Sequence, residues 1–475
     1  MRPLLVVLAC LLLPAAAAQA QSTPVVGKNA ELVNQLPEAA GAVALEWHSK
    51  KPLMVLTSDK GLITYDVTDP LSPKRLGVLP LAGDGNEGMD LVERGEKTYA
   101  LIGANLAMAA IRGTTPKVIT SNRHLLVADV SNPAMPVLVA DLELPTRTHT
   151  VSCATPECPY AYSDGRAQGR ITIVDLADPT NPKVADQFKS VVPSGHDQDV
   201  DEAGILWHVG GQGSVALDVT NPTKPVQLNS TTPAGNASTD YSGKPYNNFI
   251  HHNSYRPNGD AFDTRAKDSG AADLDKGNVL LVTEEDYLST AAAGRCGDYE
   301  GSFQTWRIPF LDAERYAALN PDGKAGGGTI EPLDRWNTEV LDSGQPTPAG
   351  AFCSAHYFDY LPGGFVAQGW YQQGTRILDV RDPADIKQVG YFFTGAMETW
   401  ASYWVPKRFA KGQTIVYTAD HVRGIDILKV TLPKASPAKT KAVRAPILPE
   451  WIAPKAGLEA RASEDWGFVC PLPLG

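Results

Sequence analysis

One pattern of apolar and polar positions recurs along the chain with a period of roughly 45 residues. Each copy has a short apolar or alternating run, then a turn of the form Asp-x-(Ser/Thr/Ala)-(Asp/Asn)-Pro, then a second apolar run. The clear copies are GLITYDVTDPLSPKRLG at 61–77, HLLVADVSNPAMPVLVADL at 124–142, RITIVDLADPTNPKVADQF at 170–188, SVALDVTNPTKPVQL at 214–228 and TRILDVRDPADIKQVGYF at 375–392. FQTWRIPFLD at 303–312 and GIDILKVTLP at 424–433 are degenerate copies in the same frame.

The chemistry of this repeat predicts short antiparallel strands. The apolar run before the turn is typical of a buried strand. In the turn, Asp or Asn can bond the local backbone and Pro fixes φ. A further strand precedes each clear copy and ends at a Gly corner, as in 55–61. About four short strands per copy is the content of one propeller blade, so we expect an all-β fold, a seven-bladed β-propeller over residues 21–433.

The spacing of the copies predicts two long loop insertions. The central Asp of the turn is residue 66, 129, 175, 218 or 379, and Arg307 and Lys429 replace it in the degenerate copies. The gaps from 218 to 307 and from 307 to 379 exceed the others and require insertions at about 228–278 and 311–350. The second contains LDAERYAALN, which predicts a short helix. Long insertions usually lie on one face, often the binding face.

The best-preserved copy resembles a known repeat family. Ile173-Val174-Asp175 is followed by Asp178-Pro179 and Asn181-Pro182, which is similar to the L-x-I-V-D-V-S-D-P-x-N-P phrase of the LVIVD repeat family. The resemblance covers roughly residues 40–433. It implies a β-propeller and implies no particular reaction.

Both ends of the chain depart from the repeat. Residues 1–20 combine Arg2, an apolar core at 4–13 and the small-residue sequence Ala18-Gln19-Ala20, which predicts a signal peptide and a secreted or periplasmic protein. Residues 434–475 are rich in Lys, Ala and Pro and predict a C-terminal tail laid over the propeller surface. No later stretch has 18 uninterrupted apolar residues, so we expect no membrane span.

Charge and cysteine content narrow the range of partners and crosslinks. The formal net charge of -11 becomes -12 when the leader, with one Arg and no acid, is removed. A net acidic chain without a basic stripe argues against nucleic acid as a partner. Cys153 and Cys158 bracket a short loop and are the expected disulfide. Among Cys296, Cys353 and Cys470 we expect one bond and one free thiol, with the pairing left open.

Histidines and glutamates recur at the start of the first strand of the predicted blades. They are His149, His196, His252, His356, Glu87 and Glu398. The first strand of each blade lines the central channel, so equivalent positions converge on the axis. In the first blade both Glu46 and His48 are candidates, and His251 is an alternative to His252 because adjacent strand residues face opposite ways.

Converging imidazoles and carboxylates are ligands for first-row transition metals. We expect the four histidines to bind Fe, Cu or Zn, with Glu87 and Glu398 as further ligands or as partners that fix the imidazole tautomer. This layout is similar to that of metal-centred propellers such as the carotenoid oxygenases and methanethiol oxidases, although none of their motifs is present. Glu285 and His421 each lie shortly after an apolar strand of the repeat pattern. They are the candidate catalytic residues.

These features predict an exported metal-dependent enzyme, an oxidoreductase acting on a small organic substrate at the propeller axis. Two alternatives remain: a non-catalytic scaffold whose channel histidines are structural, and a metal-free pocket. Trp370, Tyr371, Trp400 and Trp404 form either an aromatic wall for the substrate or part of the core. The chain lacks a Walker loop, a dinucleotide-binding glycine motif, HExxH and GxSxG, which disfavours those enzyme classes.

Overall fold

A computed structural model of the chain describes the repeats and most of the segments between them. The described residues are 25–81, 87–104, 107–109, 117–119, 121, 123–165, 169–211, 213–232, 245–247, 250–286, 301–321, 327–338, 347–348, 354–394, 397–436 and 447–448. The predicted signal peptide, Cys296, Cys353, Cys470 and most of the predicted tail lie outside them.

Each of the first six repeats folds, with the two strands before it, into a four-stranded antiparallel sheet, which we call a blade and number along the chain. Blades 1 and 2 are β3 (Ala42–Trp47), β4 (Leu53–Ser58), β5 (Gly61–Asp66), β6 (Lys74–Pro80) and β7 (Asp90–Arg94), β8 (Lys97–Ala104), β11 (His124–Asp129), β12 (Val137–Glu143). Blades 3 and 4 are β13 (Thr150–Cys153), β14 (Tyr160–Asp164), β15 (Arg170–Asp175), β16 (Lys183–Lys189) and β17 (Ser194–Val200), β18 (Ile205–Gly211), β19 (Gly213–Asp218), β20 (Val226–Ser230).

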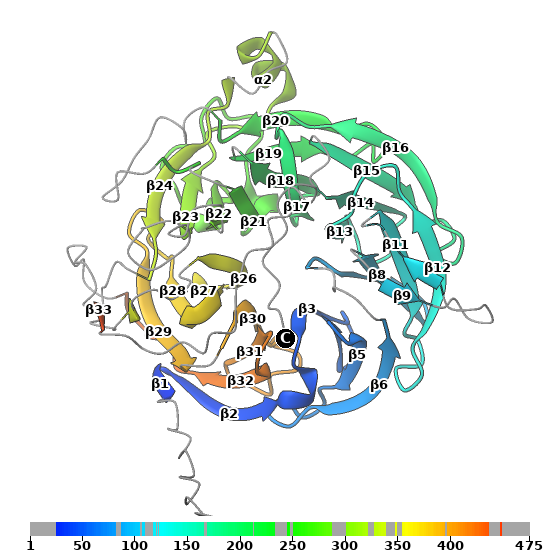
Figure 1. Cartoon of the computed structure of the whole chain (residues 1–475). Coiled ribbons are helices and arrows are strands. Elements are labelled where there is room, and N and C mark those ends of the chain that lie inside the picture. The colour runs from blue at the N-terminus through cyan, green and yellow to red at the C-terminus, as the bar shows by residue number, and fades with distance from the viewer. Residues whose placement is uncertain are drawn as a thin grey trace, which may run out of the picture.

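The remaining blades follow the same order. Blade 5 is β21 (Ile250–Tyr255), β22 (Val279–Glu285), β23 (Ser302–Arg307) and β24 (Glu331–Trp336). Blade 6 is β26 (Ala355–Leu361), β27 (Phe365–Trp370), β28 (Gly374–Asp379) and β29 (Lys387–Thr394). Blade 7 is β30 (Thr399–Trp404), β31 (Ile415–Asp420), β32 (Gly424–Val430) and β2 (Ala30–Leu36). The blades lie around one axis with the first strand of each innermost (Figure 1), and these inner strands contact their neighbours around the ring. The all-β prediction is confirmed.

The turn chemistry is the one expected from the repeat. The central Asp of each clear copy accepts a hydrogen bond from the backbone N–H two residues later. The pairs are Asp66 with Thr68, Asp129 with Ser131, Asp175 with Ala177, Asp218 with Thr220 and Asp379 with Arg381, at 2.8 to 3.1 Å. The Asp or Asn before the Pro makes the same bond, as Asp178 does with Thr180 at 2.9 Å. These paired turns explain why the phrase recurs at the same place in each blade.

An N-terminal strand completes the last blade. β2 pairs antiparallel with β32, from Ala30 opposite Val430 to Leu36 opposite Ile425. β1 (Val25–Lys28) pairs with β29 of the neighbouring blade. The two ends of the repeat array are therefore joined by backbone hydrogen bonds.

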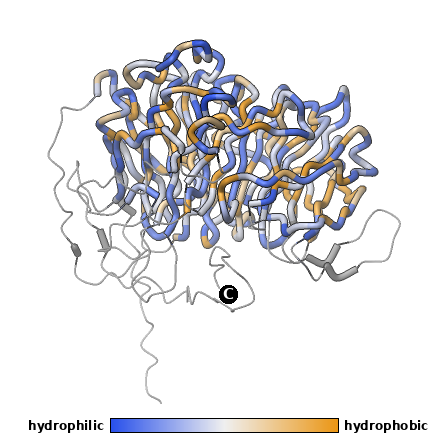
Figure 2. Tube along the Cα trace, turned by 90° about the horizontal axis from the view of Figure 1, so that it is seen from above, coloured by the Kyte–Doolittle hydropathy of each residue, from blue (hydrophilic) through white to orange (hydrophobic). Residues whose placement is uncertain are grey.

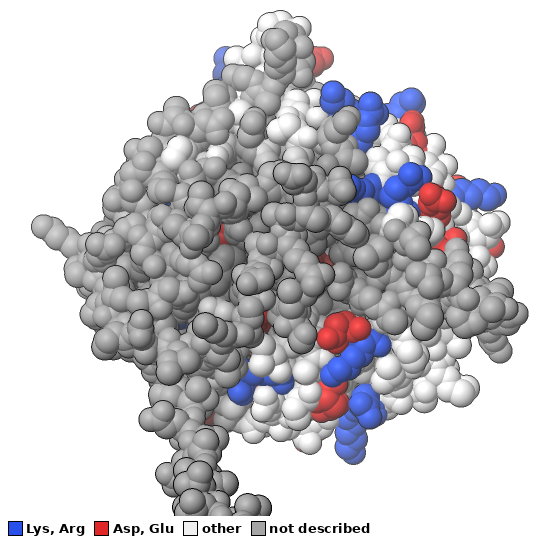
Figure 3. All heavy atoms as spheres, viewed as in Figure 1, with Lys and Arg blue, Asp and Glu red and all other residues white. Residues whose placement is uncertain are grey.

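The hydrophobic core lies between facing blades. One cluster joins blades 1 and 7 through Met54, Tyr65, Tyr417 and Ile427, all fully buried or nearly so. Hydrophobic and hydrophilic residues alternate along many strands of the body (Figure 2), as expected for a sheet whose faces pack differently. On the described part of the face in Figure 3, Lys and Arg lie among Asp and Glu.

The segments between blades add short elements. They are β9 (Ala107–Ala109) paired with β10 (Lys117–Ile119), β25 (Thr347–Pro348) paired with β33 (Ile447–Leu448), helix α2 (Ala313–Leu319), and 3-10 turns at Pro37–Ala39, Gly259–Ala261, Leu274–Lys276 and Tyr371–Gln373. Helix α2 confirms the helix predicted at 311–320, and Asp312 caps it by accepting the Arg315 N–H at 2.7 Å. Cys153 and Cys158 form the expected disulfide. None of the described helices has the length and apolar character that crossing a membrane requires.

Candidate metal centre at the propeller axis

Single-residue bulges set the direction of the side chains at the start of the inner strands. In β3, β17, β21 and β30 the pairing with the next strand skips one residue, and the skipped residues are Val43, His196, His252 and Trp400. In β26 the skipped residues are His356 and Tyr357. A bulge bends a strand and redirects a side chain, and bulges are common beside functional sites.

The bulged positions form a ring around the axis, which we call the inner ring. With Glu87 and His149 from blades 2 and 3, its members are Val43, Glu87, His149, His196, His252, His356 and Trp400. The register between blades supports this equivalence, because Gly88 pairs with Thr150 and Tyr357 with Ala401, each one residue after an inner-ring member. Four consecutive blades therefore contribute a histidine.

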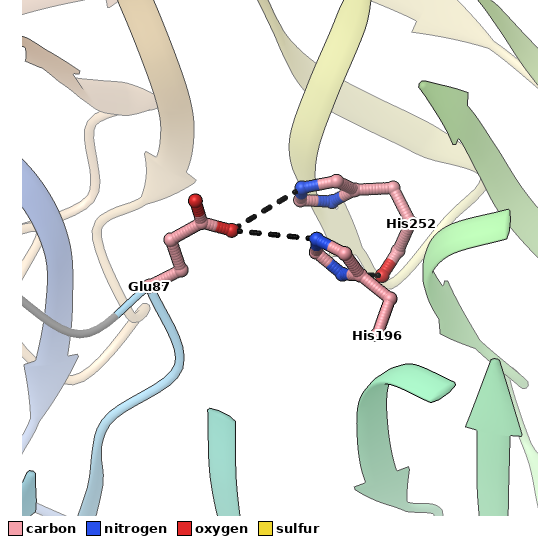
Figure 4. A group of neighbouring side chains, drawn as sticks. All are labelled: Glu87, His196 and His252. Carbon is pink, nitrogen blue, oxygen red and sulfur yellow. Dashed lines mark hydrogen bonds and ion pairs between the residues drawn. The ribbon is translucent and has the colours of Figure 1, made fainter. Parts of the chain in front are cut away.

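The four histidines converge on one carboxylate oxygen. The distances from Glu87 Oε2 to Nε2 are 3.0 Å for His149, 3.6 Å for His196, 3.5 Å for His252 and 3.7 Å for His356. The Nε2 atoms of His149 and His196 are 3.1 Å apart. Figure 4 shows Glu87 reaching toward His196 and His252, which lie side by side. All five side chains are buried.

Glu285, at the end of β22, joins the same group. Its carboxylate oxygens lie 3.7 Å from His252 Nε2 and 3.9 Å from His356 Nε2. The Tyr371 hydroxyl donates a short hydrogen bond to Glu285. Glu285, His252 and His356 form one set of side chains that can hold a metal ion, and Glu87, His196 and His252 form another. The two sets share His252, so they describe one centre.

Backbone carbonyls fix the tautomer of two of the histidines. His196 Nδ1 lies 3.0 Å from the His252 carbonyl oxygen, and His356 Nδ1 lies 2.7 Å from the Trp400 carbonyl oxygen. A carbonyl only accepts, so each Nδ1 carries the proton and donates it. In the neutral ring the Nε2 lone pair then points at the Glu87 carboxylate. That is unfavourable unless a positive charge, a metal ion or a proton, lies between them.

The electrostatics of the group also favour a bound cation. Burial alone would raise the pKa of the Glu87 carboxyl, but the facing histidines, His149 foremost, bring it well below its usual value. Burial, followed by the nearby His252, lowers the pKa of His356 well below that of a free histidine. An ionised carboxylate and a neutral imidazole are the forms that bind metal ions.

The spacing of the ligand atoms suits a single transition-metal ion. Two ligands about 2.1 Å from one ion, at angles between square and tetrahedral, lie about 3.0 to 3.4 Å apart. The separation of 3.1 Å between His149 and His196 falls in this range, and the separations of 3.0 to 3.7 Å from Glu87 exceed it by a few tenths of an ångström at most. The residues present therefore fit Fe, Cu or Zn.

Two of the predicted site residues lie beside this group instead of in it. Glu398 was predicted as a ligand or as a partner of a ligating imidazole, but among the described residues no ion pair joins it to a histidine. The bulge in β30 gives the inner-ring position to Trp400, two residues later. His421, predicted as catalytic, lies next to them, with its ring centroid 5.6 Å from that of Trp400.

His251 and the two candidates of blade 1 lie outside the inner ring. His251 faces away from the axis, where its Nδ1 lies 2.7 Å from Ser214 Oγ and its ring packs on Trp306. In blade 1 the inner-ring position is Val43, so neither Glu46 nor His48 occupies it.

His124 and His208 lie outside the inner ring and bond side chains of their own or neighbouring blades. His124 pairs with Asp141 at 2.6 Å. His208 bonds Ser190 at 2.8 Å and makes a short contact with Asp164. Asp164, at the end of β14, is fully buried against this histidine of the next blade.

A second ring, which the repeat pattern did not reveal, lies three residues further along each inner strand. Its members are Glu46, Asp90, Ser152, Asp199, Tyr255, Asp359 and Tyr403, and we call it the acidic ring. Asp90 accepts the Cys153 N–H at 2.7 Å and Asp359 accepts the Trp404 N–H at 2.9 Å, each from the next blade.

The acids of this ring face one another across the axis. Burial raises the pKa of Asp90 and Asp359 to about 7 and that of Asp199 to about 6, and the Asp199 charge adds to the shifts of Glu46, Asp90 and Asp359. Asp199 is nevertheless exposed to solvent. Solvent therefore reaches Asp199 in the acidic ring, whereas the inner-ring histidines are buried.

The aromatic residues divide between the site and the core. His356 contacts Tyr371, with ring centroids 4.9 Å apart, and Trp400, at 5.0 Å. Trp370 packs edge-on against Trp336 of blade 5 at 5.2 Å, and Trp404 lies in the core between blades 6 and 7. Of the four predicted aromatic residues, Tyr371 and Trp400 therefore lie beside the histidines.

Comparison with known proteins agrees with the fold and the repeat. The model of the LVIVD repeat matches residues 118–142, which contain the copy at 124–142. A solved structure, the Myceliophteria thermophila Cps50 (Swd1) β-propeller domain, superimposes with a TM-score of 0.50 and 11% identity, covering 85% of this chain and all of that one. At this identity the likeness shows the fold alone. No curated protein sequence matches the chain. The repeat match and the blades around one axis together show a β-propeller that carries an LVIVD repeat.

Proposed function

We propose that this protein is a metal-dependent enzyme, an oxidoreductase that acts on a small organic substrate at the propeller axis. His149, His196, His252 and His356 would hold the metal, with Glu87 and Glu285 as carboxylate ligands or as partners of the imidazoles. The N-terminal sequence supports export, so we place the enzyme in the periplasm or outside the cell.

The observation that carries this proposal is the convergence of four imidazole Nε2 atoms on one Glu87 oxygen, at 3.0 to 3.7 Å. A structural histidine needs only one hydrogen-bond partner at each nitrogen, as His208 has with Ser190 and Asp164. The inner-ring histidines instead share a single acceptor, and their rings pack in T-shaped or tilted pairs with centroids 4.0 to 4.6 Å apart. That arrangement is typical of ligands around a cation.

The donor set limits the chemistry. A bound Fe or Cu ion would supply one-electron chemistry, and any of the three metals would act as a Lewis acid toward a substrate oxygen. The Tyr371 hydroxyl donates a hydrogen bond to Glu285 and can transfer a proton to that carboxylate. The surrounding aromatic rings keep bulk water from the histidines.

Metal analysis of the purified full-length protein tests the proposal. We expect about one Fe, Cu or Zn per chain, because one ion satisfies the whole ligand set. His252 lies in both ligand groups, so the His252→Ala variant should lose the metal while its thermal unfolding shows a folded protein.

The matched control is His124→Ala. It removes a histidine of β11, the third strand of blade 2, whose Nδ1 lies 2.6 Å from Asp141 Oδ1. This variant should keep the metal content of the wild type. A stable wild-type protein with no bound metal after exposure to each ion would refute the proposal and favour the scaffold alternative.

A further inference from the structure

Three polar atoms beside the candidate metal centre have no hydrogen-bond partner among the described residues. They are Glu398 Oε1, Trp400 Nε1 and His421 Nε2. The side chains of Glu398 and Trp400 are each 1% exposed. Burying a donor or acceptor without a partner is unfavourable, and in native proteins such groups usually meet a water molecule or a ligand. Three of them in one place therefore indicate a binding site.

The three residues form one cluster at the start of blade 7. The Trp400 indole lies near enough to the Glu398 carboxyl to lower its pKa slightly, yet no hydrogen bond of normal geometry joins them. The backbone N–H of His421 donates to the backbone carbonyl oxygen of Glu398 at 2.8 Å. The rings of Trp400 and His421 are 5.6 Å apart and inclined by 30°.

This cluster adjoins the histidines directly. The ring centroids of Trp400 and His356 are 5.0 Å apart, and the Trp400 carbonyl accepts the His356 Nδ1–H at 2.7 Å. The Tyr371 ring lies 6.1 Å from Trp400 and 4.9 Å from His356. A molecule that bonded Glu398 and Trp400 would therefore lie against aromatic rings and next to a ligand of the metal.

The chemistry of the three atoms defines the ligand. An indole N–H only donates. Burial, followed by the charge of Asp420, raises the pKa of Glu398 to about 8, so at neutral pH its carboxyl group is protonated and donates as well. Burial lowers the pKa of His421, whose neutral ring can donate or accept at Nε2. Two donors and an adaptable ring beside aromatic faces suit an acceptor oxygen on a flat, uncharged molecule.

We propose that Glu398, Trp400 and His421 form a binding site for a small aromatic molecule that bears a hydrogen-bond-accepting oxygen. Describing this molecule as the substrate rests on the proposed metalloenzyme function. The binding itself does not, since none of the three residues is a metal ligand. Glu398 and Trp400 bond the oxygen, and the aromatic ring of the ligand packs against Trp400 and Tyr371.

Calorimetric titration with a matched pair of probes tests the site. Acetophenone carries a carbonyl oxygen where α-methylstyrene has a CH2 group on the same planar carbon, and the two are otherwise alike in shape. We expect the full-length protein, with or without metal, to bind acetophenone about tenfold or more tightly than α-methylstyrene, the ratio that one good hydrogen bond produces. Equal affinities for the two probes, or no binding of acetophenone, would overturn the proposal.

Variants assign the preference to named atoms. Trp400→Phe keeps an aromatic ring but removes the N–H, and should reduce the preference for acetophenone to about threefold or less. Trp404→Phe is the matched control on the same strand, because the Trp404 N–H is already bonded to the Asp359 carbonyl at 3.2 Å. That variant should retain the wild-type preference. An equal loss in both variants would show a general packing effect and refute the assignment.

If Trp400→Phe does not fold, a second pair of variants still tests the binding site. Glu398→Gln retains a donor and should keep the preference, whereas Glu398→Ala should lose it. If Glu398→Ala kept the wild-type preference for acetophenone, Glu398 would not be part of the site. Because the titration also uses metal-free protein, failure to bind metal and failure to bind acetophenone are separate results.

Discussion

Glu398 is a carboxyl group with almost no water around it, and this has a measurable consequence. Burial and the neighbouring Asp420 raise its pKa to about 8, compared with about 4.3 in an unfolded chain. Between these values the unfolded chain releases a proton that the folded protein retains. Glu398 therefore lowers the free energy of unfolding progressively as pH rises from about 4.3 through 8.

Replacing Glu398 with Gln should remove this penalty. The amide has the same shape and does not ionise, so the variant should gain stability relative to the wild type as pH rises, by on the order of a few kcal/mol at pH 8. Denaturant unfolding at pH 5 and pH 8 measures the change. Glu314→Gln, at an exposed position on helix α2, should show no such trend. A constant difference between wild type and Glu398→Gln across this range would contradict a raised pKa.

At the scale of single residues, the sequence predicted that the histidines would meet but not which residue of blade 7 would join them. The four histidines were identified because each opens the inner strand of a blade, and the structure brings them together. Glu398 was expected at the axis and Trp400 in an aromatic wall or the core, but one extra residue in β30 gives Trp400 the inner-ring position. A bulge leaves no mark in the alternation of apolar and polar residues, so its position cannot be predicted from that pattern.

At the scale of elements, each inner strand carries two functional positions three residues apart. The bulged residue enters the inner ring and the third residue after it enters the acidic ring, as His196 and Asp199 do in β17. The acidic ring was not predicted because its members differ in type from blade to blade, with four acids, two tyrosines and a serine. Only the common register of the strands relates them.

The acidic ring should make stability depend on pH. Asp90, Asp199 and Asp359 have pKa values raised to about 6 or 7, against about 3.9 in the unfolded chain. Stability should therefore fall as pH rises from about 4 to 7, because only the unfolded chain gives up these protons in that interval.

Replacing Asp199 with Asn should reduce that fall, since the Asp199 charge contributes to the raised pKa of Glu46, Asp90 and Asp359. The amide oxygen can still accept the Val200 N–H. Asp218→Asn is the matched control, because Asp218 accepts the N–H of Thr220 in a turn outside the ring. Unfolding free energies at pH 5 and pH 8 compare the two. An equal response of both variants would mean that the acids do not interact across the axis.

At the scale of the whole molecule, the closure of the ring depends on β2. This strand covers β32, and without it that strand would present an open edge of unpaired backbone groups. Deleting residues 21–36 should lower the midpoint of thermal unfolding and promote aggregation. A synthetic peptide with the sequence of residues 30–36, added in excess, should restore part of the lost stability by pairing in the vacant position.

A peptide in which Leu32 and Leu36 are replaced by Asp provides the control, because Leu36 is buried in the core between blades 1 and 7 and Leu32 packs against the core between blades 6 and 7. This peptide should not restore stability. A deleted protein that unfolded at the wild-type temperature would show that the blades hold one another without closure by β2.

The pairing of β2 with β32 also constrains the order of events during biosynthesis. Ala30 emerges from the ribosome first and must wait for Val430, 400 residues later, before its strand has a partner. Each intermediate blade can form from local contacts as it appears, but the circle cannot close until the last repeat is available. The ring therefore remains open through nearly all of the synthesis of the chain. Pairing of β2 with β32 is the last step in forming the fold.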